Sequence, residues 1–251
     1  MINISIIIPA HNEAERILPT LQNYYHFFKE LADQQTIAGF ELIVVLNGCN
    51  DNTGQVVNGY GKKYPEIRVI DMVESGKGLA VKTGFIDALK RPNDLIGFVD
   101  ADMATRPAFF YDLVREMGVH DAAIASRYMP GAYVYPTRSF VNVKVWGRKI
   151  FYHTLIRLLF NLNMYDYQCG AKLFKRQTLS TILEHLTARQ WSFDVELLYL
   201  TRLFGFSIIE VPTTWFDQTG SKLTVMNAGM KMLVSLFEIK KRHKKLANNR
   251  I

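Results

Sequence analysis

The chain has 251 residues, of which 49% are hydrophobic, so it is long and apolar enough for one large domain with a sizeable core. Six Lys and Arg residues cluster between positions 240 and 250, nearly accounting for the formal net charge of +7, and the near-neutral remainder argues against a nucleic-acid-binding surface. No apolar run reaches about 18 residues, so no membrane-spanning helix is expected. Two cysteines, with no signal peptide in view, indicate a reducing, cytosolic setting.

The first half of the chain alternates short apolar strands with helical patterns. Strands are predicted at residues 4–8, 40–46, 67–70, 95–99 and 122–125, because each is an apolar run bounded by turn-forming residues. A first helix is expected to begin near Glu13 with Asn12 as its cap, another to follow Gly76-Lys77-Gly78, and another to open at Pro107. This alternation predicts a doubly wound α/β sheet.

The strand at 95–99 is followed by two carboxylates, Asp100 and Asp102. Side chains two residues apart in an extended chain can face the same way, and hard oxygen ligands suit Mg²⁺ or Mn²⁺. The same pair is equally well explained as a strand end with two solvated acids. The spacing alone therefore leaves both a metal site and a plain strand end open.

Two amphipathic helices are predicted in the second half of the chain. Residues 142–163 carry Lys149, His153 and Arg157 at helical spacing among apolar residues, which is typical of an interfacial, membrane-lying helix or of a helix packed on the sheet. Residues 225–239 lead directly into the basic tail, a combination that favours an anionic lipid surface, with a solvated tail as the alternative. Residues 129–136 are interpreted as a long loop before the first of these helices.

Three further segments are polar or acidic. Residues 166–172 form a polar stretch before a new apolar segment. Residues 191–196 open a helix with Asp194 and Glu196 in its first turn, where the helix dipole favours negative charge. A strand over 208–211, stopped by Pro212, leads into a polar loop at 217–222.

Taken together in chain order, these segments resemble family 2 glycosyltransferases of GT-A fold, and more narrowly the polyprenyl- and dolichyl-phosphate hexosyltransferases, in particular the dolichyl-phosphate β-glucosyltransferase branch. Each segment is a weak signal alone, but their order and spacing are specific. The matching segments are I-I-I-P-A-H-N-E (6–13), N-G-C-N-D-N-T (47–53), G-K-G (76–78), D-A-D (100–102), S-R-Y (126–128), D-Y-Q-C-G-A-K (166–172), W-S-F-D-V-E (191–196) and E-V-P-T-T-W-F-D-Q-T-G-S-K (210–222).

The resemblance implies a Rossmann-like, mixed and mostly parallel sheet flanked by helices. The catalytic domain would span residues 1–224, including the interfacial helix at about 141–163. A C-terminal amphipathic helix and basic tail would follow at 225–251.

The resemblance also implies roles for individual residues. Asp100 and Asp102 match the divalent metal motif, Lys77 matches a lysine beside the donor diphosphate, and Arg127 matches an arginine near the acceptor phosphate. The other substrate-binding positions that it implies are Pro9, His11 and Glu13 for the base and ribose; Asn47, Asp51 and Ala101; Arg138 beside Arg127; Asp194 and Glu196 near the acceptor sugar; and Ser221 and Lys222 in a closing loop.

The sequence departs from the family pattern at several positions. Leu46 and Asn47 stand where the family usually has paired acids, and Ala104 stands where a Gln often follows the metal motif. Base recognition is therefore expected to differ in detail, and metal binding to rely on Asp100, Asp102 and the donor diphosphate. The transmembrane helices that the family commonly adds are not expected here, so the two amphipathic helices would have to dock on the lipid.

These expectations describe a metal-dependent inverting enzyme that moves a hexose, by family analogy glucose, from a UDP- or GDP-sugar to a polyprenyl or dolichyl phosphate. It would act peripherally, at the cytoplasmic face of an anionic membrane. The acceptor phosphate is already anionic, so positioning by Arg127 would replace a strong general base. Two alternatives are open: a transferase acting on a soluble glycan, with Asp194 or Glu196 as the base, and a non-catalytic nucleotide-sugar-binding module.

Overall fold

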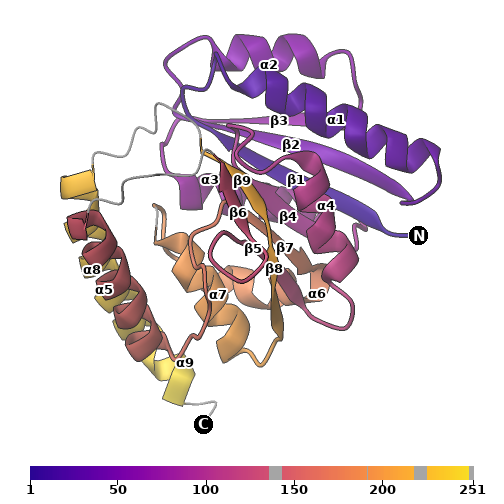
Figure 1. Cartoon of the computed structure of the whole chain (residues 1–251). Coiled ribbons are helices and arrows are strands. Elements are labelled where there is room, and N and C mark those ends of the chain that lie inside the picture. Colours follow the sequence, from indigo (N-terminus) through magenta and orange to yellow (C-terminus); the bar gives the residue numbers. More distant parts are fainter. Residues whose placement is uncertain (136–142, 191, 218–224, 249–251) are drawn as a thin grey trace.

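The computed structural model describes residues 1–135, 143–190, 192–217 and 225–248 (Figure 1). At its centre is a seven-stranded sheet in the order β3-β2-β1-β4-β7-β5-β8, in which β7 is antiparallel to both of its neighbours and the other pairs are parallel. This confirms the mixed, mostly parallel sheet. Its strands are β1 (Asn3–Ala10), β2 (Gly39–Asn47), β3 (Ile67–Met72), β4 (Leu95–Val99), β5 (Ala122–Ser126), β7 (Ala171–Lys175) and β8 (Ile208–Pro212).

Helices cover both faces of the sheet (Figure 1). Alternate residues of a strand point to opposite faces: Ile6 of β1 packs with one set of helices and Ile7 with the other. Both faces are therefore dry, which explains the continuous apolar runs of the strands. One face carries α1 (Ile17–Asp33), α2 (Thr53–Gly61) and α4 (Pro107–Glu116), and the other carries α3 (Lys77–Ala88), α6 (Arg176–Ile182) and α7 (Phe193–Leu203).

A further pair of helices, α5 (Val143–Phe160) and α8 (Val225–Arg242), runs side by side at the margin of the molecule, and α9 (Lys244–Asn248) follows (Figure 1). Ile156 of α5 and Leu236 and Ile239 of α8 are buried in the same hydrophobic cluster as α3 and α7. Within the described ranges, no helix combines the length and the hydropathy needed to cross a bilayer. The division of the chain at residue 225 stays a prediction.

Several elements differ from the sequence-based expectations. The antiparallel strand β7 begins at Ala171, inside the stretch 166–172 that was expected to precede the apolar segment. The segment interpreted as a loop contains β6 (Tyr133–Tyr135), which pairs in parallel with β9 (Thr214–Phe216). A short 3-10 helix spans Leu183–His185. The first helix begins at Ile17 because Asn12 adopts a left-handed φ of 55° and its Oδ1 accepts a hydrogen bond from the Asn50 amide (2.9 Å) instead of capping.

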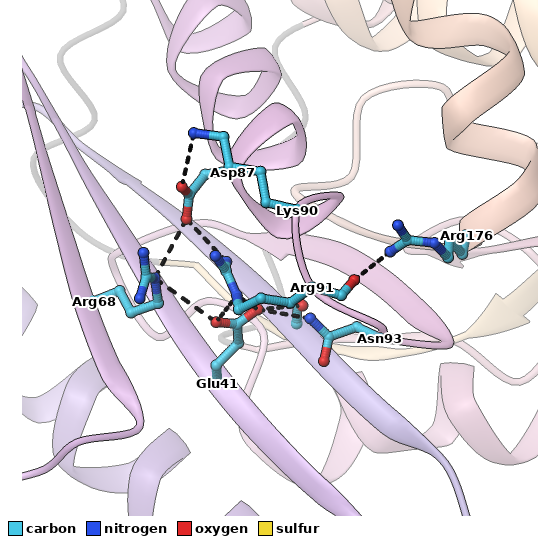
Figure 2. Close-up of polar contacts among 8 residues, drawn as sticks. Glu41, Arg68, Asp87, Lys90, Arg91, Asn93 and Arg176 are labelled. Atoms are coloured by element: carbon cyan, nitrogen blue, oxygen red, sulfur yellow. Dashed lines mark hydrogen bonds and ion pairs between the residues drawn. The ribbon is translucent and has the colours of Figure 1, made fainter.

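A polar cluster lies at the amino-terminal end of the parallel strands, where β2 and β3 begin (Figure 2). The Glu41 carboxylate, which is 8% exposed, accepts hydrogen bonds from Ser5 (2.7 Å), Arg91 (3.0 Å) and Asn93 (2.8 Å). Because Arg91 and Asn93 belong to the turn between α3 and β4, these contacts fix that turn against β1 and β2.

Asp87, near the end of α3, forms the second half of this cluster (Figure 2). Its carboxylate pairs with Arg91 (2.9 Å) and Arg68 (3.3 Å). Arg176 donates to the carbonyl oxygens of Leu89 and Arg91, so that the start of α6 is tied to the same turn. The cluster thereby holds in place the strand that ends at the two carboxylates.

Replacing Asp87 with Asn is expected to destabilise the fold by about 1.5–3 kcal/mol at neutral pH, because it weakens charge-assisted hydrogen bonds. Burial alone would raise the pKa of Asp87, but Arg91 and Arg68 outweigh it and hold the pKa below its ordinary value. A carboxylate with a lowered folded-state pKa stabilises the fold above its unfolded pKa and loses that contribution as the pH falls. Urea unfolding of wild type and Asp87→Asn should therefore differ at pH 7 and converge well below pH ~4.

Asp33→Asn is the matched control, because Asp33 pairs with Lys29 (2.6 Å) on the exposed surface of α1. Exposed pairs contribute little to stability, so this variant should unfold almost like wild type at both pH values. Equal losses in the two variants, or an Asp87→Asn deficit that persists in acid, would contradict the structural role of the cluster.

Candidate functional site

The loops that follow β1, β2, β4 and β5 leave the sheet at one edge, and the start of the antiparallel β7 reaches the same edge. In open α/β sheets, ligands bind at the edge formed by the carboxyl ends of the strands. Asp100 and Asp102 follow β4 directly at this edge, where the Asp100 amide donates to the carbonyl oxygen of Gly170 (3.0 Å). The end of β4 is thus tied to the start of β7.

The Asp100 carboxylate is fixed from two sides. A Cβ atom at position 170 would lie 2.0 Å from Asp100 Oδ2, so only glycine leaves room for this carboxylate. The other oxygen, Oδ1, forms an ion pair with the Lys77 ammonium. Lys77 opens α3 between Gly76 and Gly78, where the absence of side chains allows the helix to start close to a neighbouring loop.

Asp102 is oriented by the turn that follows it. Met103 has a left-handed φ of 61°, and the amide of Ala104 donates to Asp102 Oδ1 (3.0 Å). Burial and the negative charge of Asp100 raise the pKa of Asp102. Two partly buried carboxylates repel each other, and a bound cation would stabilise the ionised form of both.

A second ion pair lies next to the first. Lys172 of β7 is fully buried, and its ammonium contacts Asp194 Oδ1 (2.5 Å) and donates to the carbonyl oxygen of Cys169 (2.8 Å). The ammonium groups of Lys172 and Lys77 lie over the Phe98 ring, 5.5 and 5.9 Å from its centroid. A buried charge is tolerated when it is paired in this way.

The four groups alternate in sign from Asp100 through Lys77 and Asp194 to Lys172. Burial lowers the pKa of Lys77, but Asp100, Asp194 and Asp102 outweigh it, so the pKa is raised. Burial raises the pKa of Asp194, against the opposing effect of Lys172 and Lys77. Lys77 is therefore held as a cation beside the two acids that follow β4.

Asn47, at the end of β2, joins three loops. Its Nδ2 donates to the carbonyl oxygen of Ala10 (2.9 Å), its Oδ1 accepts from the Gly76 amide (3.1 Å), and its own carbonyl accepts from His11 Nδ1 (2.7 Å). Asn47 is 4% exposed, whereas His11 is exposed at the edge. Asn47 thus sets the spacing of the loops after β1 and β2 and the start of α3.

Glu13 and Asp51 shape the same side of the edge. Glu13 forms a two-pronged pair with Arg16 (2.7 and 2.9 Å), and its amide donates to Thr53 Oγ1 (2.7 Å). Asp51 Oδ1 accepts from the Thr53 amide (2.9 Å), at the first residue of α2. Both acids order the loops, and their predicted contacts with a substrate stay predictions.

Arg127 follows β5 and is paired with Asp166. Its Nε and Nη2 donate to the two carboxylate oxygens (2.6 and 2.9 Å), its amide donates to Oδ2 (3.1 Å), and its guanidinium lies over the Trp215 ring (4.9 Å). Burial lowers the pKa of Arg127, but Asp166 outweighs it and the pKa is raised. A guanidinium carries five N–H donors, so this pairing leaves others for a phosphate.

Glu196 occupies a different position from the one expected. It is fully buried, and its carboxylate binds the backbone amides of Thr187 and Ala188 and the imidazole of His243. Residues two apart on a helix point about 200° apart, so Glu196 faces away from Asp194. The expectation of an acceptor-sugar contact does not agree with these contacts.

The remaining predicted positions are distributed as follows. Pro9 lies within β1, and the carbonyl oxygen of Ala101 accepts a hydrogen bond from Thr20 (2.7 Å). Arg138, Ser221 and Lys222 lie outside the described residues, and their roles stay predictions.

Three site residues were not singled out by the sequence analysis. Asp166, Gly170 and Lys172 contact Arg127, Asp100 and Asp194, respectively. The available signal was their place in one polar stretch, with a glycine and a lysine at the start of an apolar run. What the sequence does not reveal is that this run is an antiparallel strand.

The residues present fit a divalent cation that takes part of its ligands from a substrate. Within the described ranges, no group of three or more His, Cys, Asp or Glu side chains is placed to hold a metal. Asp100 and Asp102 supply two hard oxygen donors, and the raised pKa of Asp102 reflects a charge that a cation would offset. Mg²⁺ is commonly held by one or two carboxylates together with substrate phosphates.

The fold is similar to that of glucosyl-3-phosphoglycerate synthase from Mycobacterium tuberculosis, solved in complex with Mn²⁺, UDP and phosphoglyceric acid. The TM-score is 0.68 at 19% sequence identity, and the match covers 95% of this chain and 78% of that one. At this identity the likeness shows the fold, which confirms the expected GT-A architecture.

Two curated relatives match almost the whole chain. The dolichyl-phosphate β-glucosyltransferase of Drosophila melanogaster is 34% identical over 248 residues, covering 95% of this chain and 74% of that protein. The human protein of the same name is 29% identical over 252 residues, covering 96% and 75%. The family model described as glycosyl transferase family 2 matches residues 5–183. The chain therefore belongs to glycosyl transferase family 2 and is a glycosyltransferase.

Proposed function

We propose that this chain transfers glucose, with inversion at the anomeric carbon, from a nucleoside diphosphate sugar to dolichyl phosphate or a related polyprenyl phosphate. Its relatives carry the name of that activity. The observation that carries the proposal is the placement of two charged half-sites on nearby strand ends. Asp100 and Lys77 meet after β4, Arg127 and Asp166 meet after β5, and only β7 lies between the two strands.

The first half-site suits the donor diphosphate. Mg²⁺ or Mn²⁺ held by Asp100 and Asp102 would offset the negative charge that develops on the leaving diphosphate. Lys77 adds a positive charge at the N-terminus of α3, where backbone amides also attract anions. The solved neighbour that holds UDP and Mn²⁺ makes UDP-glucose the first donor to test, with GDP-hexoses second.

The second half-site suits the acceptor phosphate. Asp166 and Trp215 hold the Arg127 guanidinium in one orientation. Its remaining N–H groups can therefore donate to an incoming phosphate, which its positive charge also attracts. The phosphate oxygen is anionic at neutral pH and attacks the anomeric carbon without losing a proton. Positioning in line with the departing diphosphate therefore replaces general-base catalysis.

A soluble glycan acceptor has less support, because its hydroxyl group would need a base. The two acids considered for that role are already engaged: Asp194 pairs with Lys172, and Glu196 binds the 187–188 backbone and His243. A purely binding module also has less support, because Asp100, Lys77 and Arg127, which the proposed transfer would use, lie together at this edge of the sheet.

We also propose that the chain reaches its lipid acceptor from the cytoplasmic face of the membrane. The contact would be made by a surface on α5, α8 and α9, called here the α5–α8 surface. Large hydrophobic side chains are exposed on both helices, and basic residues continue the same side of α8 into α9. An apolar patch beside clustered lysines is the combination that binds anionic bilayers. The surface consists of Phe151 (59% exposed), Leu158 (77%), Val234 (54%) and Phe237 (54%), with exposed Lys241, Lys244 and Lys245.

A transfer assay tests the reaction itself. Purified chain is incubated with radiolabelled UDP- or GDP-hexoses, a short polyprenyl phosphate, and Mg²⁺ or Mn²⁺. Label should move from UDP-glucose into the organic phase and should stop moving when a chelator is added. Donor consumption without organic-phase label would point to a soluble acceptor, and no consumption of any donor would support a binding module.

Asp102→Asn is expected to reduce transfer at least 100-fold, because an amide is a far weaker ligand than a carboxylate for a hard cation. Because the pKa of Asp102 is raised in the folded protein, its ionised carboxylate destabilises the metal-free fold at neutral pH. The melting temperature of the metal-free variant should therefore equal or exceed that of wild type. Full activity, or loss of activity through unfolding, would contradict the assignment. Asp112→Asn, on the exposed surface of α4 beside Arg115, is the control and should keep full activity.

Replacing Lys244 and Lys245 with Gln should weaken binding to anionic vesicles about 30-fold, since each basic residue near such a surface contributes about 1 kcal/mol. The matched control replaces Lys62 and Lys63, an adjacent exposed pair just after α2, and should bind like wild type. Vesicle sedimentation at low and high salt measures both, and the difference should shrink as salt screens the charges. Equal binding by the two double variants would remove the α5–α8 surface from the proposal.

Deleting the basic tail would be a poorer test of the same idea. His243 lies within the basic run but is 3% exposed and contacts Glu196. Removal of residues 240–251 would therefore also remove a buried contact, and a loss of binding would have two explanations.

A further inference from the structure

The loop at residues 186–190 lies against the start of α3, the helix that Lys77 opens. The Leu79 amide donates to the carbonyl oxygen of Arg189 (3.2 Å), and Lys82 donates to the carbonyl oxygen of Leu186 (2.5 Å). A Cβ atom at Gly76 would lie 2.6 Å from the Arg189 oxygen, and one at Gly78 would lie 2.6 Å from the Ala188 oxygen. The position of this loop therefore sets the position of the first turn of α3.

Glu196 of α7 holds that loop. Its Oε2 accepts from the amides of Thr187 (2.9 Å) and Ala188 (2.6 Å), and its Oε1 accepts from Thr187 Oγ1 (2.7 Å). Burial alone would raise the pKa of Glu196, but hydrogen bonds from His243, Thr187 and Ala188 outweigh it and hold the pKa below its ordinary value. Glu196 is thus an anion that receives four hydrogen bonds inside the protein.

The fourth hydrogen bond comes from the C-terminal end of the chain. His243, between α8 and α9, is 3% exposed, and its Nε2 lies 2.7 Å from Glu196 Oε1. An ionised carboxylate only accepts hydrogen bonds, so Nε2 carries the proton and donates. The carboxylate consequently joins the 186–190 loop and α7, which are neighbours in the sequence, to the end of α8, which lies far from them in the sequence.

Two other contacts bring α8 to the same place. Ser235 Oγ lies 2.5 Å from Ser192 Oγ, next to the start of α7, and Arg242 donates to Thr187 Oγ1 (3.0 Å). The helix that contributes half of the α5–α8 surface is therefore packed directly on the loop that supports α3.

We propose that Glu196 and His243 are positioning residues for the donor: together they hold the 186–190 loop, and through it the start of α3, so that Lys77 meets the donor diphosphate. The inference rests on the proposed role of Lys77 and adds two residues that do not contact substrate. It also assigns the last turn of α8 a part in donor binding, separate from any contact with lipid.

Glu196→Gln tests this with a change of one charge and almost no volume. The amide nitrogen of Gln can only donate, so either a backbone N–H loses its acceptor or His243 Nε2 and Thr187 Oγ1 must accept instead of donate. In both cases the loop amides lose a hydrogen bond to a charged group. Affinity for UDP with Mn²⁺, or for GDP if that is the bound nucleotide, should fall about 10–100-fold, by analogy with the loss when a residue that orients a metal ligand is replaced. The KM for the donor should rise accordingly, while the KM for the polyprenyl phosphate stays within about two-fold.

The control is Glu184→Gln, because Glu184 also pairs with a histidine, His185 (3.1 Å), but its side chain is 75% exposed. This variant should bind nucleotide like wild type. Hydrogen exchange gives a readout that needs no substrate: the amides of Leu79 and Ala188 should exchange faster in Glu196→Gln and unchanged in Glu184→Gln.

His243 provides an independent pair of variants if Glu196→Gln does not fold. His243→Leu removes the donor and should reproduce the loss of nucleotide affinity, and His243→Gln restores an N–H donor and should recover part of it. Equal nucleotide affinity in wild type, Glu196→Gln and His243→Leu would overturn the positioning role alone. A wild-type protein that binds neither UDP nor GDP would overturn the proposed donor site as well.

Discussion

The geometry of the site depends on the Asp100 carboxylate, which is paired with the Lys77 ammonium and fits only because residue 170 is a glycine. Asp100 lies against the Cα of Gly170 and pairs with Lys77, so it fixes the distance between the end of β4, the start of β7 and the start of α3. A lysine brought this close to an apolar core needs a counter-charge, and Asp100 and Asp194 both lower the free energy of its charged form. Asp194 is balanced in turn by Lys172. The positions of these four side chains at the carboxyl ends of the strands follow from the need to place each charge beside one of opposite sign.

The reversed direction of β7 makes that alternation possible. A parallel strand between β4 and β5 would bring its carboxyl end to the edge, but β7 brings its first residues there instead. Gly170 consequently lies beside Asp100, and the segment just before it places Asp166 beside Arg127. One short stretch of chain therefore supports both half-sites, which lie on strands that are separated only by β7.

The sequence predicts the parts of this arrangement that depend on local pattern. The five strands of the first half are apolar runs buried on both faces, and the two acids after β4 are visible because they interrupt such a run. Partners across the sheet are not visible in the same way. Nothing in the spacing of residues 166–172 indicates that Lys172 is buried against Asp194, since pairing between strands depends on sheet order. The contacts of Glu196 are hidden in the sequence for a related reason. An acid in the first turn of a helix is typical of helix capping or of a substrate-binding site, and only the path of α8 shows that Glu196 binds His243.

The C-terminal helix has two differently packed sides, which the sequence presents as one basic, amphipathic segment. Its inner residues, Leu236 and Ile239, belong to the core, and its outer residues, Val234 and Phe237, are exposed. The lysines on the outer side are suited to a lipid surface, whereas His243, in the middle of the same basic run, is buried against Glu196. If residues 240–248 were a solvated tail, His243 would be exposed to water, but it is buried. The contacts of His243 tie the end of α8 to the loop that supports Lys77, so the surface proposed for lipid and the contact with this loop belong to one helix.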